Sequence, residues 1–459
     1  MSGDGIWARL ASRRDDLRTQ LWPLPVLGVL VGLALGIALP RLDRRIDGHL
    51  PTSVTSYLFE GGPSAARTLL GAVAGSLITV TALTFSLTVV TLQLASSQFS
   101  PRLLRAFTRD RFVHVTLALF LLTFTYALAA LRSVRSAADD RAVFVPQIAV
   151  TLAFALTVAS ILGMVLFLAH LAQEIRVETM LRKVDGDARE TIRRTLDERQ
   201  EGCAPVGRPA PRGHAVTLPA GASGFLVQLD EDALLGAAVD ADAILLIERS
   251  AGSSLVVGTP VGVGWARDGT LDLPTTERLR RRVAEAITAG FERTSVEDIA
   301  YGLRQLTDVA SKALSPGVND PTTAVHALGH SSALLCEIAA RDLDPRLLRD
   351  DDGRVRVALC RPQFSDLLEI ALTQPRRYGA ADPFVVARLF ALLRELAWCV
   401  REAGQQVAVS EQLGRLQASV AAQEFDPVEN DRLAVLADLV RHAQAGRWIT
   451  DPKSAWADR

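Results

Sequence analysis

The feature that most constrains this chain is a stretch from Thr68 to Pro101 in which none of the 34 residues is charged. Three further apolar runs long enough to span a bilayer lie within the first 175 residues. A helix of the longest run would measure about 50 Å, which exceeds the roughly 30 Å of a bilayer's hydrocarbon core. The pattern predicts an α-helical integral membrane protein whose longest helix tilts or extends beyond the lipid.

Four transmembrane helices are predicted, at residues 21–40, 68–95, 112–131 and 143–168. An even number of spans places both termini on the same side of the membrane. The link between the second and third spans carries a basic cluster of Arg102, Arg105, Arg109 and Arg111. The positive-inside rule assigns that link to the cytoplasm. We therefore expect a multi-pass protein with cytoplasmic N and C termini.

The first apolar run has an alternative interpretation as a signal peptide. It is 20 residues long, lacks a small-residue cleavage site and ends in Pro40. These features favour an uncleaved transmembrane helix.

The rest of the chain has a different composition, because charged residues become frequent after residue 173 and no later run reaches spanning length. Short apolar stretches broken by glycine predict a small β domain over residues 213–270. Its order of elements resembles the barrel-sandwich domains that carry lipoyl or biotinyl groups. The segment contains no lysine, which excludes a carrier arm of that type. The predicted domains are a transmembrane domain (1–175), a helical connector and linker (176–212), the β domain (213–270) and an all-α cytoplasmic domain (271–459).

Helices are expected in the last domain at about 276–288, 295–314, 321–338, 364–372, 383–404, 411–423 and 427–442. Three of them begin with the same dipeptide, in which Asp320, Asp382 or Asp426 precedes a proline. An aspartate caps the first free amides of a helix, and a proline at the first helical position loses no hydrogen bond. We interpret these aspartates as N-caps.

Polar side chains follow two faces of the second span. One stripe contains Thr81, Thr84, Thr88, Thr91 and Gln98, and the opposite stripe contains Thr79, Ser86, Gln93 and Ser97. Hydroxyl groups in a membrane helix bond their own backbone, bridge to another helix or line a water-filled path. The first stripe is therefore a candidate for pore lining or for helix packing. In an oligomer, one stripe could face neighbouring helices and the other a central axis.

The basic cluster after this span also has two interpretations. Its arginines would lie at the level of anionic lipid headgroups, where they anchor the helix. If the second span lines a pore, the same arginines form a positive ring at the inner mouth, which would favour anions.

Cofactor and nucleic-acid functions find no support in the composition. The net charge of −1 gives no reason to expect binding to nucleic acid.

The four cysteines follow the last span and are at least 24 residues apart, at Cys203, Cys336, Cys360 and Cys399. That spacing and compartment predict free thiols rather than disulfides or a zinc site. His326 and His330 share a helical face, but no third ligand is evident, so neither a metal nor another cofactor is expected.

The segment at residues 313–324, ALSPGVNDPTTA, is the most distinctive sequence in the C-terminal half. It ends one helix and begins another. Its short polar side chains form either a polar or anion-binding site or a well-capped turn. The residues concerned are Ser315, Asn319, Asp320, Thr322 and Thr323.

This segment also carries a resemblance to a known family. Together with GSLITV at 75–80, FSL at 85–87 and SSQFSPRLL at 96–104, it resembles a bacterial family of predicted inner-membrane proteins that is defined only as a domain of unknown function. The resemblance covers nearly the whole chain. It implies an inner-membrane location and the domain order above, and it implies no activity, ligand or catalytic residue.

Two functions are compatible with these patterns. We expect a homo-oligomeric channel or pore with a cytoplasmic gating or vestibule domain, an order of domains also found in small-conductance mechanosensitive channels. The alternative is a membrane-anchored sensor or scaffold whose cytoplasmic half binds a ligand or a protein. An enzyme is not expected, because the sequence shows no nucleophile motif, phosphate loop or metal set. The expected partners are the lipid bilayer and further copies of the chain.

Overall fold

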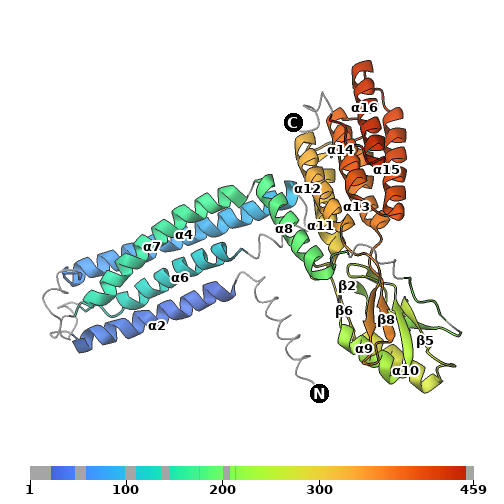
Figure 1. Cartoon of the computed structure of the whole chain (residues 1–459). Helices are drawn as coiled ribbons and strands as arrows, with labels where there is room; N and C mark the ends of the chain where they lie inside the picture. Colours follow the sequence, from blue (N-terminus) through green and yellow to red (C-terminus); the bar gives the residue numbers. More distant parts are fainter. Residues whose placement is uncertain are drawn as a thin grey trace. The chain divides into compact units, whose positions relative to one another are not determined.

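The computed structural model describes residues 22–46, 58–98, 110–135, 144–174, 176–199, 207–211 and 213–450. The chain divides into two compact units, an N-terminal unit (Met1–Thr179) and a C-terminal unit (Met180–Arg459) (Figure 1).

In the part that the structure describes, the N-terminal unit contains four long apolar helices. These are α2 (Pro23–Ile46), α4 (Pro63–Gln98), α6 (Arg111–Leu131) and α7 (Gln147–Glu174). Each is long and apolar enough to cross a membrane, which confirms the four predicted spans. Helix α6 packs against the other three.

Small residues allow α2 and α6 to approach closely. A Cβ at Gly28 would lie 2.5 Å from the carbonyl oxygen of Ala118, and a Cβ at Gly32 would lie 2.4 Å from that of Leu122. Glycine at this four-residue spacing is a common means of close packing between membrane helices. Asp43 then fixes α2 to the start of α7, because its buried carboxylate accepts hydrogen bonds from the amides of Ile148 (3.2 Å) and Ala149 (3.0 Å).

The C-terminal unit contains two β-sheets and two helices that pack against them. Strands β1 (Val216–Pro219), β5 (Pro260–Ala266), β3 (Ala243–Ile247), β8 (Val355–Leu359) and β7 (Arg346–Arg349) form one sheet in that order. Strands β4 (Ser254–Leu255), β2 (Gly224–Leu229) and β6 (Ile287–Gly290) form the other. Strands β3 and β8 are parallel, with Leu245 opposite Val357. Helices α9 (Glu231–Asp240) and α10 (Leu273–Glu285) contribute Leu234 and Val283 to the core shared with these strands.

Seven further helices belong wholly or partly to this unit. They are α8 (Val177–Thr195), α11 (Ile299–Ala313), α12 (Pro321–Ala339), α13 (Phe364–Tyr378), α14 (Pro383–Cys399), α15 (Ala403–Ala421) and α16 (Pro427–Gln444). Helix α14 lies among the others and packs against α12, α13, α15 and α16. Asp320, Asp382 and Asp426 each accept a hydrogen bond from an amide in the first turn of α12, α14 and α16, which confirms the predicted N-caps.

Two expectations differ from the structure. Residues 271–459 are not all helical, because β6, β7 and β8 lie within them. The strands of residues 213–270 do not form a separate barrel-sandwich domain either, since β3 has β8 as a neighbour and β2 has β6. The reason is that β8 is a short strand whose partner β3 lies far away in the sequence. Local patterns reveal a strand's propensity but do not identify its partner.

Candidate functional site

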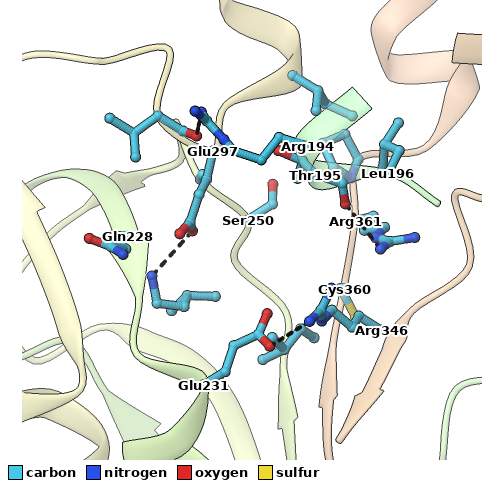
Figure 2. Close-up of a pocket in the computed structure, with 16 residues that line it drawn as sticks. Arg194, Thr195, Leu196, Gln228, Glu231, Ser250, Glu297, Arg346, Cys360 and Arg361 are labelled. Atoms are coloured by element: carbon cyan, nitrogen blue, oxygen red, sulfur yellow. Dashed lines mark hydrogen bonds and ion pairs between the residues drawn. The ribbon is translucent and has the colours of Figure 1, made fainter. Parts of the chain in front are cut away.

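The C-terminal unit contains a pocket of about 560 Å³ beyond the carboxyl ends of β3 and β8 (Figure 2). Because these two strands are parallel, their carboxyl ends meet at one edge of the sheet. In mostly parallel α/β sheets, ligands commonly bind beyond the carboxyl ends of the strands; among the described pairs of this sheet only β3 and β8 are parallel. Helices α9 and α11 begin at the same place, with Glu231 and Ile299 lining the pocket. Several elements thus converge on one cavity.

One wall follows the end of β8. The amide of Cys360 donates to the carbonyl of Ile247 (2.9 Å), which continues the pairing of β3 and β8 to the edge of the pocket. The guanidinium of Arg361 donates to the carbonyls of Asp342 (2.7 Å) and Thr195 (3.2 Å). Arg361 therefore fixes the end of α8 against the sheet. Burial raises the pKa of the Cys360 thiol, so this group is neutral at physiological pH.

Two carboxyl groups line the pocket in different environments. Glu297 is partly buried and accepts a hydrogen bond from the amide of Leu229 (3.3 Å). Burial raises the pKa of Glu297 above its ordinary value. Glu231 forms a more exposed ion pair with Arg346 at 2.9 Å (Figure 2). The pocket thus combines a partly buried carboxyl group with a more exposed ion pair.

Arg194 adds a third charged group from the last turn of α8. Its guanidinium donates to the carbonyls of Val296 and Ser295. Gln228 and Ser250 add neutral polar groups, and Leu196, Leu229, Ala251, Ile299 and Pro362 add apolar surface. Such a lining can hold a small molecule of mixed polarity. None of the residues that line the pocket is a histidine, so Ser250 and Cys360 have no imidazole base there.

The first predicted stripe of the second span lies inside the bundle. Thr84, Thr88 and Thr91 are buried, and each hydroxyl donates at 2.8 Å to the backbone carbonyl four residues earlier. Thr81 is half-buried and donates to Leu77 at 2.7 Å. Gln98 ends α4, but its side chain lies outside the described residues. The geometry of the four threonines is that of helix packing.

The opposite stripe faces outward from the same helix. Thr79, Ser86 and Gln93 are exposed. Gly71 and Gly75 lie on this face, and a Cβ at either position would meet no atom within 4 Å. The described helices of the bundle therefore leave this side of α4 uncovered.

Of the predicted basic cluster, only Arg111 can be placed. It begins α6 and is exposed. Arg102, Arg105 and Arg109 lie outside the described residues.

The residues of the ALSPGVNDPTTA segment form a turn whose hydrogen bonds are local. The Ser315 hydroxyl donates to the carbonyl of Lys312 (2.7 Å), and Asp320 accepts from the amide (3.1 Å) and the hydroxyl (2.6 Å) of Thr323. Asn319 has a φ of 50°, a conformation that asparagine tolerates better than most residues. Thr322 is exposed, and none of these five polar residues lines the pocket. The arrangement is that of a capped turn between α11 and α12.

The pocket residues were missed by sequence reasoning. They come from six separate segments, and only the fold brings them together. The available signal was a short, mostly apolar strand, β8, whose end is followed directly by the polar residues Cys360 and Arg361.

Comparisons with known proteins agree with the membrane-type composition of the N-terminal unit. Residues 18–395 match the family described as predicted membrane protein DUF2254. The uncharacterized proteins Mb1321c of Mycobacterium bovis and Rv1290c of Mycobacterium tuberculosis are each 35% identical to this chain over 428 residues, which cover 93% of this chain and 81% of each relative. No solved structure matches the chain. With four apolar helices long enough to span a membrane, this chain belongs to the DUF2254 family of predicted membrane proteins, whose function is unknown.

Proposed function

We propose that this protein is a membrane-anchored sensor whose C-terminal unit lies in the cytoplasm and binds a small molecule of mixed polarity. The observation that carries this proposal is the pocket at the carboxyl ends of β3 and β8, which is lined by the partly buried Glu297. A partly buried carboxyl group gains most from a ligand that brings a positive charge, because the ligand offsets the cost of desolvation. The favoured ligand therefore carries an amine.

The other end of such a ligand has two arginines available in the same pocket. Arg346 is about half exposed in its ion pair with Glu231, and Arg194 lines the pocket from α8. Guanidinium groups bind carboxylates and phosphates by paired hydrogen bonds. The ligand class is thus a zwitterion or an amine-bearing phosphate.

Chain connectivity supports a sensing role for the pocket. Helix α8 follows the last membrane helix, α7, with only two residues between them. The last turn of α8 and the two residues beyond contribute Arg194, Thr195 and Leu196 to the pocket. A ligand that contacts these residues would stabilise one arrangement of α8 relative to another. Such a difference in binding free energy between two arrangements is what allows binding at one site to act on a distant part of a protein.

The test is binding of amino acids and amino-sugar phosphates to the purified full-length protein. A panel is screened by thermal shift, and hits are measured by calorimetry. Replacing Glu297 with Gln keeps the shape and removes the charge, and we expect Kd to rise about tenfold or more, since hydrogen bonds between charged groups contribute about 1.5–3 kcal/mol. Glu285→Gln, an exposed carboxylate outside the pocket, is the matched control and should leave Kd unchanged. Equal affinity in wild type and E297Q, or no binding across the panel, contradicts the proposal.

A homo-oligomeric channel is the second candidate, and one observation favours it. The outward face of α4 carries Thr79, Ser86 and Gln93 in a single stripe, together with Gly71 and Gly75. Amide and hydroxyl groups gain little from contact with lipid tails, whereas they are well suited to a neighbouring helix or to water. In an oligomer this stripe, rather than the packed threonines, would face the other copies or a central axis.

A further inference from the structure

Three side chains of the metal-ligand type meet at one end of the N-terminal unit. Asp110, His170 and Glu174 each offer one ligand atom, and these atoms all lie within 4.8 Å of one another. The closest approach is 2.5 Å, between Asp110 Oδ2 and His170 Nε2. We propose that this cluster binds a divalent transition-metal ion of the zinc or manganese class.

The local structure explains why the three groups converge. His170 and Glu174 are four residues apart on α7 and therefore share a face of the helix. Asp110 is the N-cap of α6, and its Oδ1 accepts a hydrogen bond from the amide of Phe112 at 2.9 Å. That bond leaves Oδ2 directed toward His170. The ring of Phe112 lies 4.8 Å from the imidazole of His170 and limits its movement.

The donor set selects the kind of ion. Imidazole nitrogen favours zinc, copper, iron and nickel, and carboxylate oxygen suits manganese, magnesium and calcium, so a mixed set favours zinc or manganese over magnesium. Metal–ligand distances of about 2.0–2.2 Å fit a site in which the Asp110 and His170 atoms move slightly apart and Glu174 moves closer. Three protein ligands leave coordination positions for water. All three side chains are half-buried, so an ion would replace part of the solvent around two carboxylates.

A simple ion pair between Asp110 and His170 is the competing explanation. It accounts for the 2.5 Å contact and involves Asp110 and His170 alone. A metal site requires all three residues. Glu174 is therefore the residue that distinguishes the two explanations.

The experiment titrates the full-length protein, purified in detergent and freed of metal with a chelator, with ZnCl₂, MnCl₂ or MgCl₂. Calorimetry gives Kd, and mass spectrometry of the native protein counts the bound ions. We expect one zinc or manganese ion per chain and much weaker binding of magnesium. Glu174→Gln and Asp110→Asn should each raise Kd at least about tenfold. Asparagine retains the N-cap function at position 110, so the second variant is expected to fold.

Glu178→Gln provides the matched control, because Glu178 is an exposed carboxylate in the first turn of α8, four residues after Glu174, and is not part of the cluster. This variant should bind metal like the wild type. A second readout is thermal stability, since an ion bound only by the folded protein raises Tm in the wild type and not in E174Q. The absence of stoichiometric zinc or manganese in the wild type, or unchanged affinity in E174Q, overturns the proposal and leaves the ion pair.

Discussion

At the residue scale, the structure brings together groups that the sequence leaves far apart. Cys336 on α12 and Cys399 at the end of α14 are free thiols, as expected from sequence, and they are hydrogen-bonded to each other. The bond from the Cys336 thiol is the main cause that lowers the pKa of Cys399 to about 7. The same interaction raises the pKa of Cys336. Cys399 is therefore the more reactive thiol of the pair near neutral pH.

This pairing predicts a pH-dependent reaction. Alkylation of Cys399 by iodoacetamide should accelerate as pH rises through about 7, because the thiolate is the reacting form. In C336A the hydrogen bond is lost, and the midpoint should move up toward the ordinary thiol value of about 8.5. Peptide mass spectrometry measures the rate at each pH. C360A is the control, and Cys399 in this variant should keep the wild-type pH midpoint of alkylation. If C336A also kept the wild-type midpoint, Cys336 would not stabilise the Cys399 thiolate.

At the element scale, helix starts were predictable and strand partners were not. The Asp-Pro pairs at 320, 382 and 426 identify helix N-termini because capping depends on neighbouring residues alone. Strand β8 illustrates the opposite case, since its pairing with β3 joins segments separated by several helices. The second span was predictable only in part. Its two polar stripes follow from helical periodicity, but the packing of the bundle decides which stripe is buried.

The turn before α12 supports a prediction on stability. Replacing Asp320 with Ala removes the acceptor for the amide and hydroxyl of Thr323, and the free energy of unfolding should fall by about 1 kcal/mol. Asp320→Asn retains a capping oxygen and should lose less. Chemical denaturation of the purified protein, followed by circular dichroism, measures both variants. A loss of ligand binding in D320A without a loss of stability would instead support the polar or anion site first considered for this turn.

At the scale of the whole molecule, the distribution of hydropathy separates a membrane-type unit from a mixed α and β unit. Among the described residues, the four helices that are long and apolar enough to span a membrane all lie in the N-terminal unit, and the pocket lies in the C-terminal unit. Within the N-terminal unit, the uncovered face of α4 is the feature that bears on assembly. A channel needs several copies of this unit, because one bundle of four packed helices encloses no wide pore.

The channel hypothesis makes its own prediction at this scale. Ser86→Asp places a negative charge on the outward stripe, whereas Thr84→Asp places one in the packed interior. If the protein is a channel, S86D should fold, assemble and shift ion preference toward cations, while T84D should mainly destabilise the bundle, because an unpaired charge is buried. Single-channel recording in planar bilayers, with the oligomer mass measured on the same sample, provides the readout. A folded protein that is monomeric or carries no current under voltage and tension contradicts the channel.

The sequence by itself determined the membrane class of this protein, the number of its spanning helices, the starts of three C-terminal helices and its family resemblance. These properties depend on local hydropathy, capping and motif, all of which act over a few consecutive residues. The tertiary structure alone decided that β8 joins β3, that Thr84 and Thr88 are packed while Ser86 is exposed, and that six segments surround Glu297. The physical reason is that pairing, burial and convergence are relations between distant residues, whose free energies arise only once the chain has folded.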